Sequence, residues 1–241
     1  MVSSSNWHAV CLVANESCYQ LHMNPLIFAN RREAGAALAA ELKQYRGRGD
    51  VVVLALPRGG VPVGYEVARA LDAPLDVFVV RKLGAPGHRE LAMGAIASGG
   101  VRVLNRDVIG WYGISRAAIE ATAREELAEL ERREGAYREG RQALDLKGKT
   151  VILVDDGLAT GSTMKAAVQA VRQLGPARLV VAAPVGAPHT CSELQELADE
   201  VVCARTPEDF AAVGQFYADF EQTGDAEVRE LLREAAAAGA H

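Results

Sequence analysis

Short, continuously apolar runs alternate along this chain with segments whose apolar residues recur every three or four positions. The runs are rich in valine, which predicts buried β-strands, and the periodic segments predict amphipathic helices. The predicted strands cover residues 51–56, 76–80, 151–154, 179–183 and 200–204. Continuously apolar strands separated by helices indicate an α/β fold in which helices cover both faces of a parallel sheet.

Two stretches break this alternation. Residues 94–105 contain two short extended runs around Gly99 and Gly100, which predicts a β-hairpin. Residues 115–141 predict one long, highly charged helix with a narrow apolar stripe. Because no repeat or low-complexity linker divides the chain, we expect a single domain over residues 23–241 with this helix as an inserted arm.

Residues 1–22 precede the pattern, which begins at Met23. They have no basic segment, and their apolar core is too short for a secretory signal. We interpret them as a disordered and removable N-terminal extension. A functional N-terminal arm is the alternative.

The composition narrows the class of protein. Of the 241 residues, 49% are hydrophobic and 24% are charged, and the formal net charge is -5, which is typical of a soluble globular protein. A mildly acidic chain has no general attraction to nucleic acid or anionic membranes, and its apolar runs are far too short to span a bilayer. The four cysteines, at positions 11, 18, 191 and 203, form no CxxC motif and indicate thiols in a reducing cytoplasm.

The stretch VILVDDGLATGSTM, residues 151–164, places two carboxylates between a predicted strand and a predicted helix. Free backbone N–H groups at the start of a helix, aided by the helix dipole, bind phosphate. The loop offered for this consists of Ala159, Thr160, Gly161, Ser162 and Thr163. It holds no lysine, which excludes a Walker A loop. Asp155 and Asp156 accept hydrogen bonds and therefore suit sugar hydroxyls, so the stretch predicts a sugar-phosphate site. The alternative is that one aspartate caps the helix and the other is solvated.

A second candidate anion site follows the strand predicted at residues 51–56. In ALPRGGVPVG, residues 55–64, Gly59 and Gly60 expose backbone N–H groups and Arg58 adds a positive charge. Two such turns at the same edge of a parallel sheet favour a ligand with two separated phosphate groups. An ordinary strand-to-helix turn is the alternative.

A third group of basic residues follows the strand predicted at residues 76–80. It consists of Arg81, Lys82, His88 and Arg89. The glycines and the proline between them predict a mobile loop that could close over a diphosphate and exclude water. A solvated basic loop is the alternative.

These motifs resemble those of the type I phosphoribosyltransferases. VILVDDGLATGST is similar to their motif for 5-phosphoribosyl-1-pyrophosphate (PRPP), PRGG to their pyrophosphate loop, and RKLGAPGHRELAMGAI to the segment before their mobile loop. The motif order, with FANRREAG before and PEDFAAVGQFYADFEQTGDAEV after, resembles a bacterial group of phosphoribosyltransferase-like proteins from about residue 27 onward. The resemblance implies a parallel sheet of five strands with a smaller hood.

The resemblance also implies a reaction, in which a nitrogen nucleophile, often a nucleobase, displaces pyrophosphate from PRPP. The two aspartates would hold the ribose hydroxyls and favour positive charge at C1, and residues 159–163 would bind the 5-phosphate. The groups implied for the diphosphate are Arg58, Gly59, Gly60, Arg81 and Lys82. Mg²⁺ would be carried by PRPP and would need no cage of protein ligands.

The chain departs from the better-known members of the family at two positions. Gly157 stands where they carry an apolar residue, and Ser162 replaces a glycine. Ser162 keeps its N–H group, so we expect phosphate binding to persist. The departures leave open a second hypothesis, a non-catalytic module that senses PRPP or a related nucleotide.

The acceptor is not identified by any motif, and a homo-oligomer also remains open. The charged helical arm is one candidate for acceptor recognition. The other is an aromatic tail with Phe210, Phe216, Tyr217 and Phe220. An aromatic face could stack on a base, or the tail could pack against the edge of the core.

Overall fold

A computed structural model describes residues 27–238, and its largest element is a five-stranded parallel sheet in the order β2-β1-β6-β7-β8. The strands are β1 (Val51–Ala55), β2 (Leu75–Val77), β6 (Thr150–Val154), β7 (Arg178–Val185) and β8 (Glu200–Arg205). All neighbouring pairs are parallel. The expected α/β fold with a parallel sheet of about five strands is therefore confirmed.

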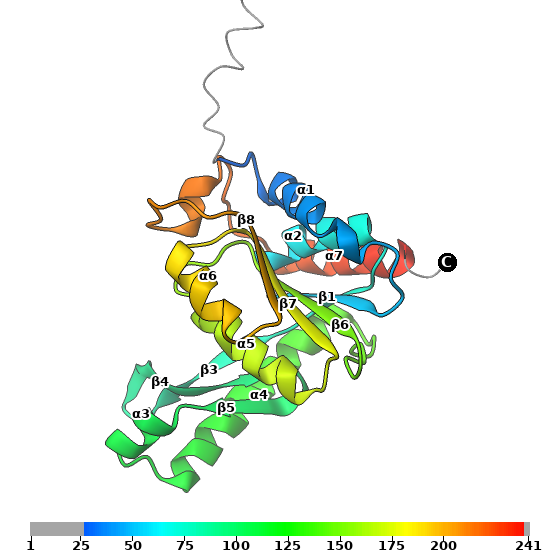
Figure 1. Ribbon diagram of the computed structural model, residues 1–241. Helices are drawn as coiled ribbons and strands as arrows, with labels where there is room; N and C mark the ends of the chain where they lie inside the picture. Colours follow the sequence, from blue (N-terminus) through cyan, green and yellow to red (C-terminus); the bar gives the residue numbers. More distant parts are fainter. Residues whose placement is uncertain (1–26, 239–241) are drawn as a thin grey trace, which may run out of the picture.

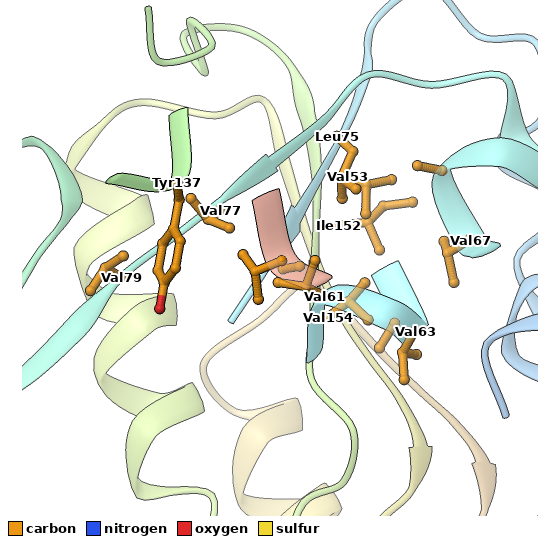
Figure 2. Packing of buried hydrophobic residues seen from close by; sticks show 14 of the residues in the cluster. Val53, Val61, Val63, Val67, Leu75, Val77, Val79, Tyr137, Ile152 and Val154 are labelled. Atoms are coloured by element: carbon orange, nitrogen blue, oxygen red, sulfur yellow. The ribbon is translucent and has the colours of Figure 1, made fainter. Parts of the chain in front are cut away.

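Helices cover both faces of this sheet, as the sequence predicts (Figure 1). One face packs against α1 (Arg31–Glu41), α2 (Gly60–Leu71) and α7 (Asp225–Ala238), and the other against α5 (Ser162–Gln173) and α6 (Pro188–Gln195). Successive strand residues point to opposite faces, so Val53 joins the first core and Leu54 the second. Figure 2 shows Val53, Ile152 and Val154 of the strands beside the valines of α2. Side chains buried on both faces explain why the strands read as unbroken apolar runs.

A second, antiparallel sheet of three strands lies below the first in Figure 1. It consists of β3 (Val80–Ala85), β4 (His88–Ala97) and β5 (Val101–Leu104). The hairpin predicted around Gly99 and Gly100 joins β4 to β5 through the short 3-10 helix η3 (Ser98–Gly100). Both glycines have positive φ angles, 78° and 73°, which side-chain-bearing residues rarely adopt.

The strand predicted over residues 76–80 is wrong in its extent. It divides into β2, which joins the parallel sheet, and β3, which starts the antiparallel sheet. The chain crosses between the sheets at Phe78 and Val79: the Phe78 amide still donates to Ala55, whereas the Val79 amide donates to the Ser98 hydroxyl. An apolar run cannot report such a crossing, because both halves are buried.

The segment predicted as an irregular loop after Leu83 also differs. It continues β3, turns at Gly87 and returns as β4, so most of it is a β-hairpin. The pairing shifts register on both sides of Gly84. Glycine and proline in this segment therefore mark a bulge and a tight turn.

The charged arm is the helix α4 (Arg116–Arg138), preceded by α3 (Arg106–Trp111) and joined to the parallel sheet at its C-terminal end. Its apolar stripe is buried at Ile119, Ala123, Leu130 and Tyr137. Arg138 contacts Asp76 of β2 at 3.0 Å, and both side chains are almost buried. The helix thus covers β3 and bridges the two sheets.

The remaining predictions concern the N-terminal extension, the cysteines and membrane-spanning helices. The N-terminal extension predicted at residues 1–22 lies outside the described residues, as do Cys11 and Cys18. Cys191 and Cys203 are free thiols, with 2.9 Å between their Sγ atoms. Within residues 27–238, no helix is long and apolar enough to cross a membrane.

The 3-10 helices η2 (Lys43–Tyr45) and η4 (Val213–Phe216) complete the described elements. The η4 segment continues the chain after β8 and lies beyond the carboxyl ends of the strands, where it pairs with the residues before α1. It therefore forms part of a small hood over that edge of the sheet.

Candidate functional site

The two predicted anion-binding turns meet because β1 and β6 are neighbours in the sheet. Ala55 and Val154 are in register at the carboxyl ends of these strands, and the Leu56 amide donates to the Val154 carbonyl at 2.9 Å. The sequence segments 55–60 and 154–156, about a hundred residues apart along the chain, therefore lie side by side. This is the edge at which ligands bind in open parallel sheets.

Glycine at positions 59 and 60 allows this close approach. A Cβ atom on Gly59 would overlap Asp156 Oδ2 and lie 2.7 Å from its Cγ. A Cβ atom on Gly60 would lie 2.8 Å from the Val154 carbonyl oxygen and 3.0 Å from the Asp155 Cα. The PRGG turn is thus fitted against both acids. The Pro57–Arg58 peptide bond within it is cis.

The two aspartates have different surroundings. Burial, and secondly the charge of Asp156, raise the pKa of Asp155 well above its ordinary value. Asp156 forms an ion pair with Arg31, whose Nε donates to its Oδ2 at 2.8 Å, and the two side chains are only 16% and 12% exposed. Neither acid caps α5, because the N-terminal capping residue of that helix is Gly161.

The loop at residues 159–163 leads into the N-terminal end of α5, as predicted. Gly161 has a φ angle of 65°, and a Cβ atom there would lie 2.5 Å from Thr190 of α6. The Thr190 hydroxyl donates to the Ala159 carbonyl at 2.5 Å, so α6 supports the loop from behind. Thr160, Ser162 and Thr163 are exposed. Their hydroxyls and the first N–H groups of α5 are therefore available to an anion.

Lys82 shares a cavity with this loop, whereas Arg81 does not. Lys82, Ser162 and Thr163 line one cavity of about 370 Å³ between the antiparallel sheet and α5. Arg81 precedes Lys82 on β3 and points to the opposite face, where its Nε donates to Glu126 of α4 at 2.5 Å. Strand alternation thus separates two neighbouring basic residues that the sequence groups together.

Arg58 also points away from the acids. Its guanidinium lies 3.8 Å from Asp225 of α7, in a cavity shared with α4. The backbone of the PRGG turn faces Asp155 and Asp156, whereas its arginine side chain faces the helical arm. His88 is exposed beside Tyr112, and His189 is 84% exposed, so neither approaches the acids.

Arg31, Tyr217 and Phe220 are site residues that the sequence did not single out for contact with the acids. The Tyr217 hydroxyl donates to the Asp156 carbonyl at 2.6 Å, and burial raises its pKa. The Arg31 guanidinium lies 4.0 Å from the centre of the Phe220 ring. No spacing rule links Arg31 to Asp156, 125 positions later.

The aromatic tail has a mixed role. Phe216 and Tyr217 are buried with Phe28, and Phe210 packs against Phe216, so most of the tail covers the edge of the core. Phe220 is 38% exposed and is the aromatic residue of the tail that most clearly offers a face to solvent near the acids. The tail also explains Gly157, because a Cβ atom at that position would lie 2.5 Å from a methyl group of Val213 in η4.

Comparison with known proteins now identifies the family. The family model for the phosphoribosyl transferase domain matches residues 24–221. The chain belongs to the phosphoribosyl transferase family. It is 50% identical over 218 residues to a Mycobacterium tuberculosis protein named "Putative phosphoribosyl transferase", and the match covers 89% of this chain and 49% of that protein. The chain thus spans about half the length of the curated relatives it matches.

A solved structure supports the fold of the phosphoribosyl transferase domain. The crystal structure of TT1426 from Thermus thermophilus is 45% identical in sequence and superimposes with a TM-score of 0.77. The match covers 86% of this chain and 98% of that one. The family resemblance stated from the motifs is therefore confirmed, and the site described above lies at the edge where its motifs meet.

Proposed function

We propose that this domain transfers the phosphoribosyl group of PRPP to a nitrogen nucleophile and releases pyrophosphate. The observation that carries the proposal is the meeting of the PRGG turn with Asp155 and Asp156, beside the loop at the N-terminal end of α5. Backbone N–H groups at two neighbouring turns and two acceptors between them match a ligand with a phosphate, a ribose and a diphosphate.

Each part of the site has a role in this reaction. The N–H groups and hydroxyls of residues 159–163 bind the 5-phosphate, and the N–H groups of Gly59 and Gly60 bind the diphosphate. Asp155 and Asp156 accept hydrogen bonds from the ribose hydroxyls and stabilise positive charge as the bond from C1 to the diphosphate breaks. Lys82 adds a charge on the other side of the phosphate loop, where it shares a cavity with Ser162 and Thr163.

Arg31 prepares Asp156 for this role. Its guanidinium holds the carboxylate in one position and balances its charge while the site is empty. Asp155 instead has a raised pKa, because burial and the charge of Asp156 favour its protonated form. A positive charge close to Asp155 lowers its pKa again. It therefore favours the ionised carboxylate, which is the form that the reaction uses.

Mg²⁺ fits this site as an ion carried by the substrate. Among residues 27–238, no three His, Cys, Asp or Glu side chains gather as a metal site. Mg²⁺ prefers hard oxygen ligands, which phosphate oxygens of PRPP and water would supply while Asp155 and Asp156 hold the ribose. When bound, it would neutralise the diphosphate charge.

The acceptor, in this proposal, binds between the acids and the hood formed by residues 28–31 and 210–223. Phe220 offers a partly exposed ring beside Arg31, which suits a flat, nitrogen-containing acceptor such as a nucleobase. Phe220→Ala should raise the KM of the acceptor several-fold and leave PRPP affinity unchanged. An equal loss of PRPP affinity would contradict this placement of the acceptor.

The central experiment measures calorimetric binding of PRPP with Mg²⁺ beside pyrophosphate release with a panel of nucleobases and small amines. Asp155→Asn and Asp156→Asn keep the side-chain shape and should lower turnover about 10²-fold or more, with a smaller change in PRPP affinity. Thr163→Ala should mainly weaken PRPP binding, by about 1.5–3 kcal/mol. Asp72→Asn is the matched control, because Asp72 is exposed at the C-terminal end of α2 and far from the acids.

The outcomes test the ribose assignment and the transferase activity separately. If neither aspartate variant changes binding or turnover, the ribose assignment is wrong. If the wild-type protein binds PRPP and no acceptor supports pyrophosphate release, a module that senses PRPP replaces the transferase.

A further inference from the structure

Three arginines from distant parts of the chain line one small cavity beside the PRGG turn. The cavity has a volume of about 180 Å³ and is lined by Arg58, Arg132, Arg133, Ala136, Tyr137 and Asp225. Arg58 comes from the turn after β1, and Arg132 and Arg133 come from the charged helix α4. No motif in the sequence predicts a function for Arg132 or Arg133.

The charges around this cavity are not balanced. Glu129 serves both Arg132 and Arg133, with contacts of 2.7 Å and 2.8 Å, and these arginines lower the pKa of Glu129 to about 2. Asp225 accepts a hydrogen bond from the Tyr137 hydroxyl at 2.8 Å and lies 3.8 Å from Arg58. Three guanidinium groups and one carboxylate, that of Asp225, therefore line the cavity, in a chain whose net charge is -5. Like charges brought together in a small cavity repel one another, and a bound anion reduces that cost.

The arginines also have hydrogen-bond donors to spare. A guanidinium carries five N–H groups. Arg132 uses Nε and Nη2 for Glu129, and Arg133 uses Nε. Within the part of the chain that the structure describes, the Arg58 side chain makes only its 3.8 Å ion pair, which is too long for a hydrogen bond. The side chains are 34%, 66% and 45% exposed for Arg58, Arg132 and Arg133, so a ligand can reach them.

Tyr137 gives the cavity a rigid wall. Its ring is buried and packs beside Val77 and Val79 in Figure 2, while its hydroxyl reaches Asp225. Because the ring is fixed in the core and α4 is tied to β2 through Arg138 and Asp76, the arginines of α4 stand on a fixed support. They are therefore held beside the turn whose backbone faces the two aspartates.

We propose that Arg58, Arg132 and Arg133 form a binding pocket for a phosphoryl group. A phosphoryl dianion fits better than a carboxylate, because its three oxygens can each accept from a different guanidinium, whereas a carboxylate has two. Such a group has two possible sources: the diphosphate end of PRPP, or a separate phosphate-bearing effector. The first source rests on the proposed transferase function, and the second does not.

The test uses inorganic pyrophosphate as the probe, without PRPP or Mg²⁺, and measures its affinity by calorimetry. The double variant Arg132→Gln with Arg133→Gln should bind pyrophosphate at least 10-fold more weakly than the wild type. Arg116→Gln with Arg124→Gln is the matched control, because it removes two charges from exposed positions of the same helix. Unchanged affinity in the Arg132 and Arg133 double variant overturns the pocket. An equal loss in the Arg116 and Arg124 control, or in Arg124→Gln alone, also overturns it, because general charge would then explain the binding.

Arg132→Lys is a milder variant that keeps the test decisive if the double variant fails to fold. It keeps the charge and removes the planar fork, so pyrophosphate affinity should fall by less than in the double variant and more than in the Arg124 control. Affinity equal to that of the wild type contradicts the assignment of Arg132.

Competition then distinguishes the two sources. If saturating PRPP abolishes pyrophosphate binding in the wild type, the pocket holds the diphosphate end of PRPP. If both bind together, the pocket takes a separate effector. If PRPP does not bind at all while pyrophosphate binding still depends on Arg132 and Arg133, the transferase proposal fails and the pocket stands.

Discussion

The two sheets of this protein differ in burial and in what they contribute to the site. In the parallel sheet β1 and β6 are buried along their whole length and pair without interruption, and their ends position the backbone around Asp155 and Asp156. In the antiparallel sheet β5 is half-buried, and the pairing of β3 with β4 shifts at Gly84. Local opening costs less where fewer groups are buried. We therefore expect the parallel sheet to hold the two aspartates in place and the antiparallel sheet to open more readily.

Hydrogen exchange tests this contrast most directly and should give the largest effect. Amides in β6 should exchange only by opening that approaches global unfolding, whereas those at residues 84–89 should exchange many-fold faster. PRPP with Mg²⁺ should slow exchange at residues 84–89, because we expect the hairpin to close over the diphosphate. Equally slow exchange at these residues with and without ligand would contradict the mobility of the hairpin.

The bridge between the sheets provides the second test. Arg138 of α4 pairs with Asp76 of β2, and their side chains are 12% and 8% exposed. Arg138→Met removes the charge and keeps most of the volume, which leaves the buried Asp76 with backbone donors from Val77 and Leu144 but without its charged partner. We expect the free energy of unfolding to fall by about 3–5 kcal/mol. Chemical denaturation measures it, and Arg124→Met on the exposed face of α4 is the control. A loss of equal size in both variants would show that helix propensity, and not the buried pair, is responsible.

Two glycine substitutions compare the PRGG turn beside the parallel sheet with the helix α4 that covers the antiparallel sheet. Gly60→Ala places a Cβ atom 2.8 Å from the Val154 carbonyl, where backbone cannot yield, and should cost about 1–3 kcal/mol. Gly135→Ala on α4 meets nothing within 4 Å and should stabilise the protein by about 0.5–1 kcal/mol, because alanine favours a helix. Thermal unfolding of both variants checks the opposite signs. A tolerated Gly60→Ala would mean that the PRGG turn is less tightly packed against the acids.

The same contrast in burial decided what could be predicted from the sequence. The strands β1, β6 and β7 are buried on both faces almost throughout, so their apolar runs located them within a residue or two. The strand β8 is only half-buried, but its apolar run located it equally well. The hairpin of β3 and β4 was interpreted as a loop, because glycine and proline also occur in bulges and tight turns. The strand predicted at residues 76–80 failed, because no local pattern marks where a chain passes from one sheet to another.

The candidate site divides in a similar way. Asp155, Asp156 and the loop at residues 159–163 were predicted as site residues from the sequence, because a strand, two acids and small residues before a helix form a local pattern. The structure places the PRGG turn against both acids and the loop at the start of α5, and their roles stay a prediction. Arg31 was missed, because its contact with Asp156 depends on how α1 folds over the strand ends. Arg58 and Arg81 were identified as basic residues, but strand and turn geometry directs both toward α4.

The pH dependence of stability tests the buried acid. Because burial and Asp156 raise the pKa of Asp155, the folded protein binds its proton more tightly than the unfolded chain does. The wild type therefore loses stability as the pH rises from the ordinary aspartate pKa, near ~4, toward the raised value. Asp155→Asn does not ionise, so it should melt at a higher temperature than the wild type at pH 7. The difference should shrink as the pH falls toward 4. A constant difference across this range would indicate a change in packing and not in charge.

The smallest effect is expected at the other end of α4, where an ion pair ties it to the antiparallel sheet. Arg102 Nη1 of β5 lies 2.8 Å from Glu120 Oε2, but the two side chains are 32% and 43% exposed. Water and salt screen such a pair, so Glu120→Gln should lower the melting temperature far less than Arg138→Met does. Thermal unfolding of Glu120→Gln, Arg102→Gln and the double variant isolates the pairwise interaction. Raising the salt concentration should remove what remains of it and leave the effect of Arg138→Met nearly unchanged. A coupling as large as that of the buried pair would mean that α4 is held equally firmly at both ends. The antiparallel sheet would then be too rigid to carry a closing hairpin.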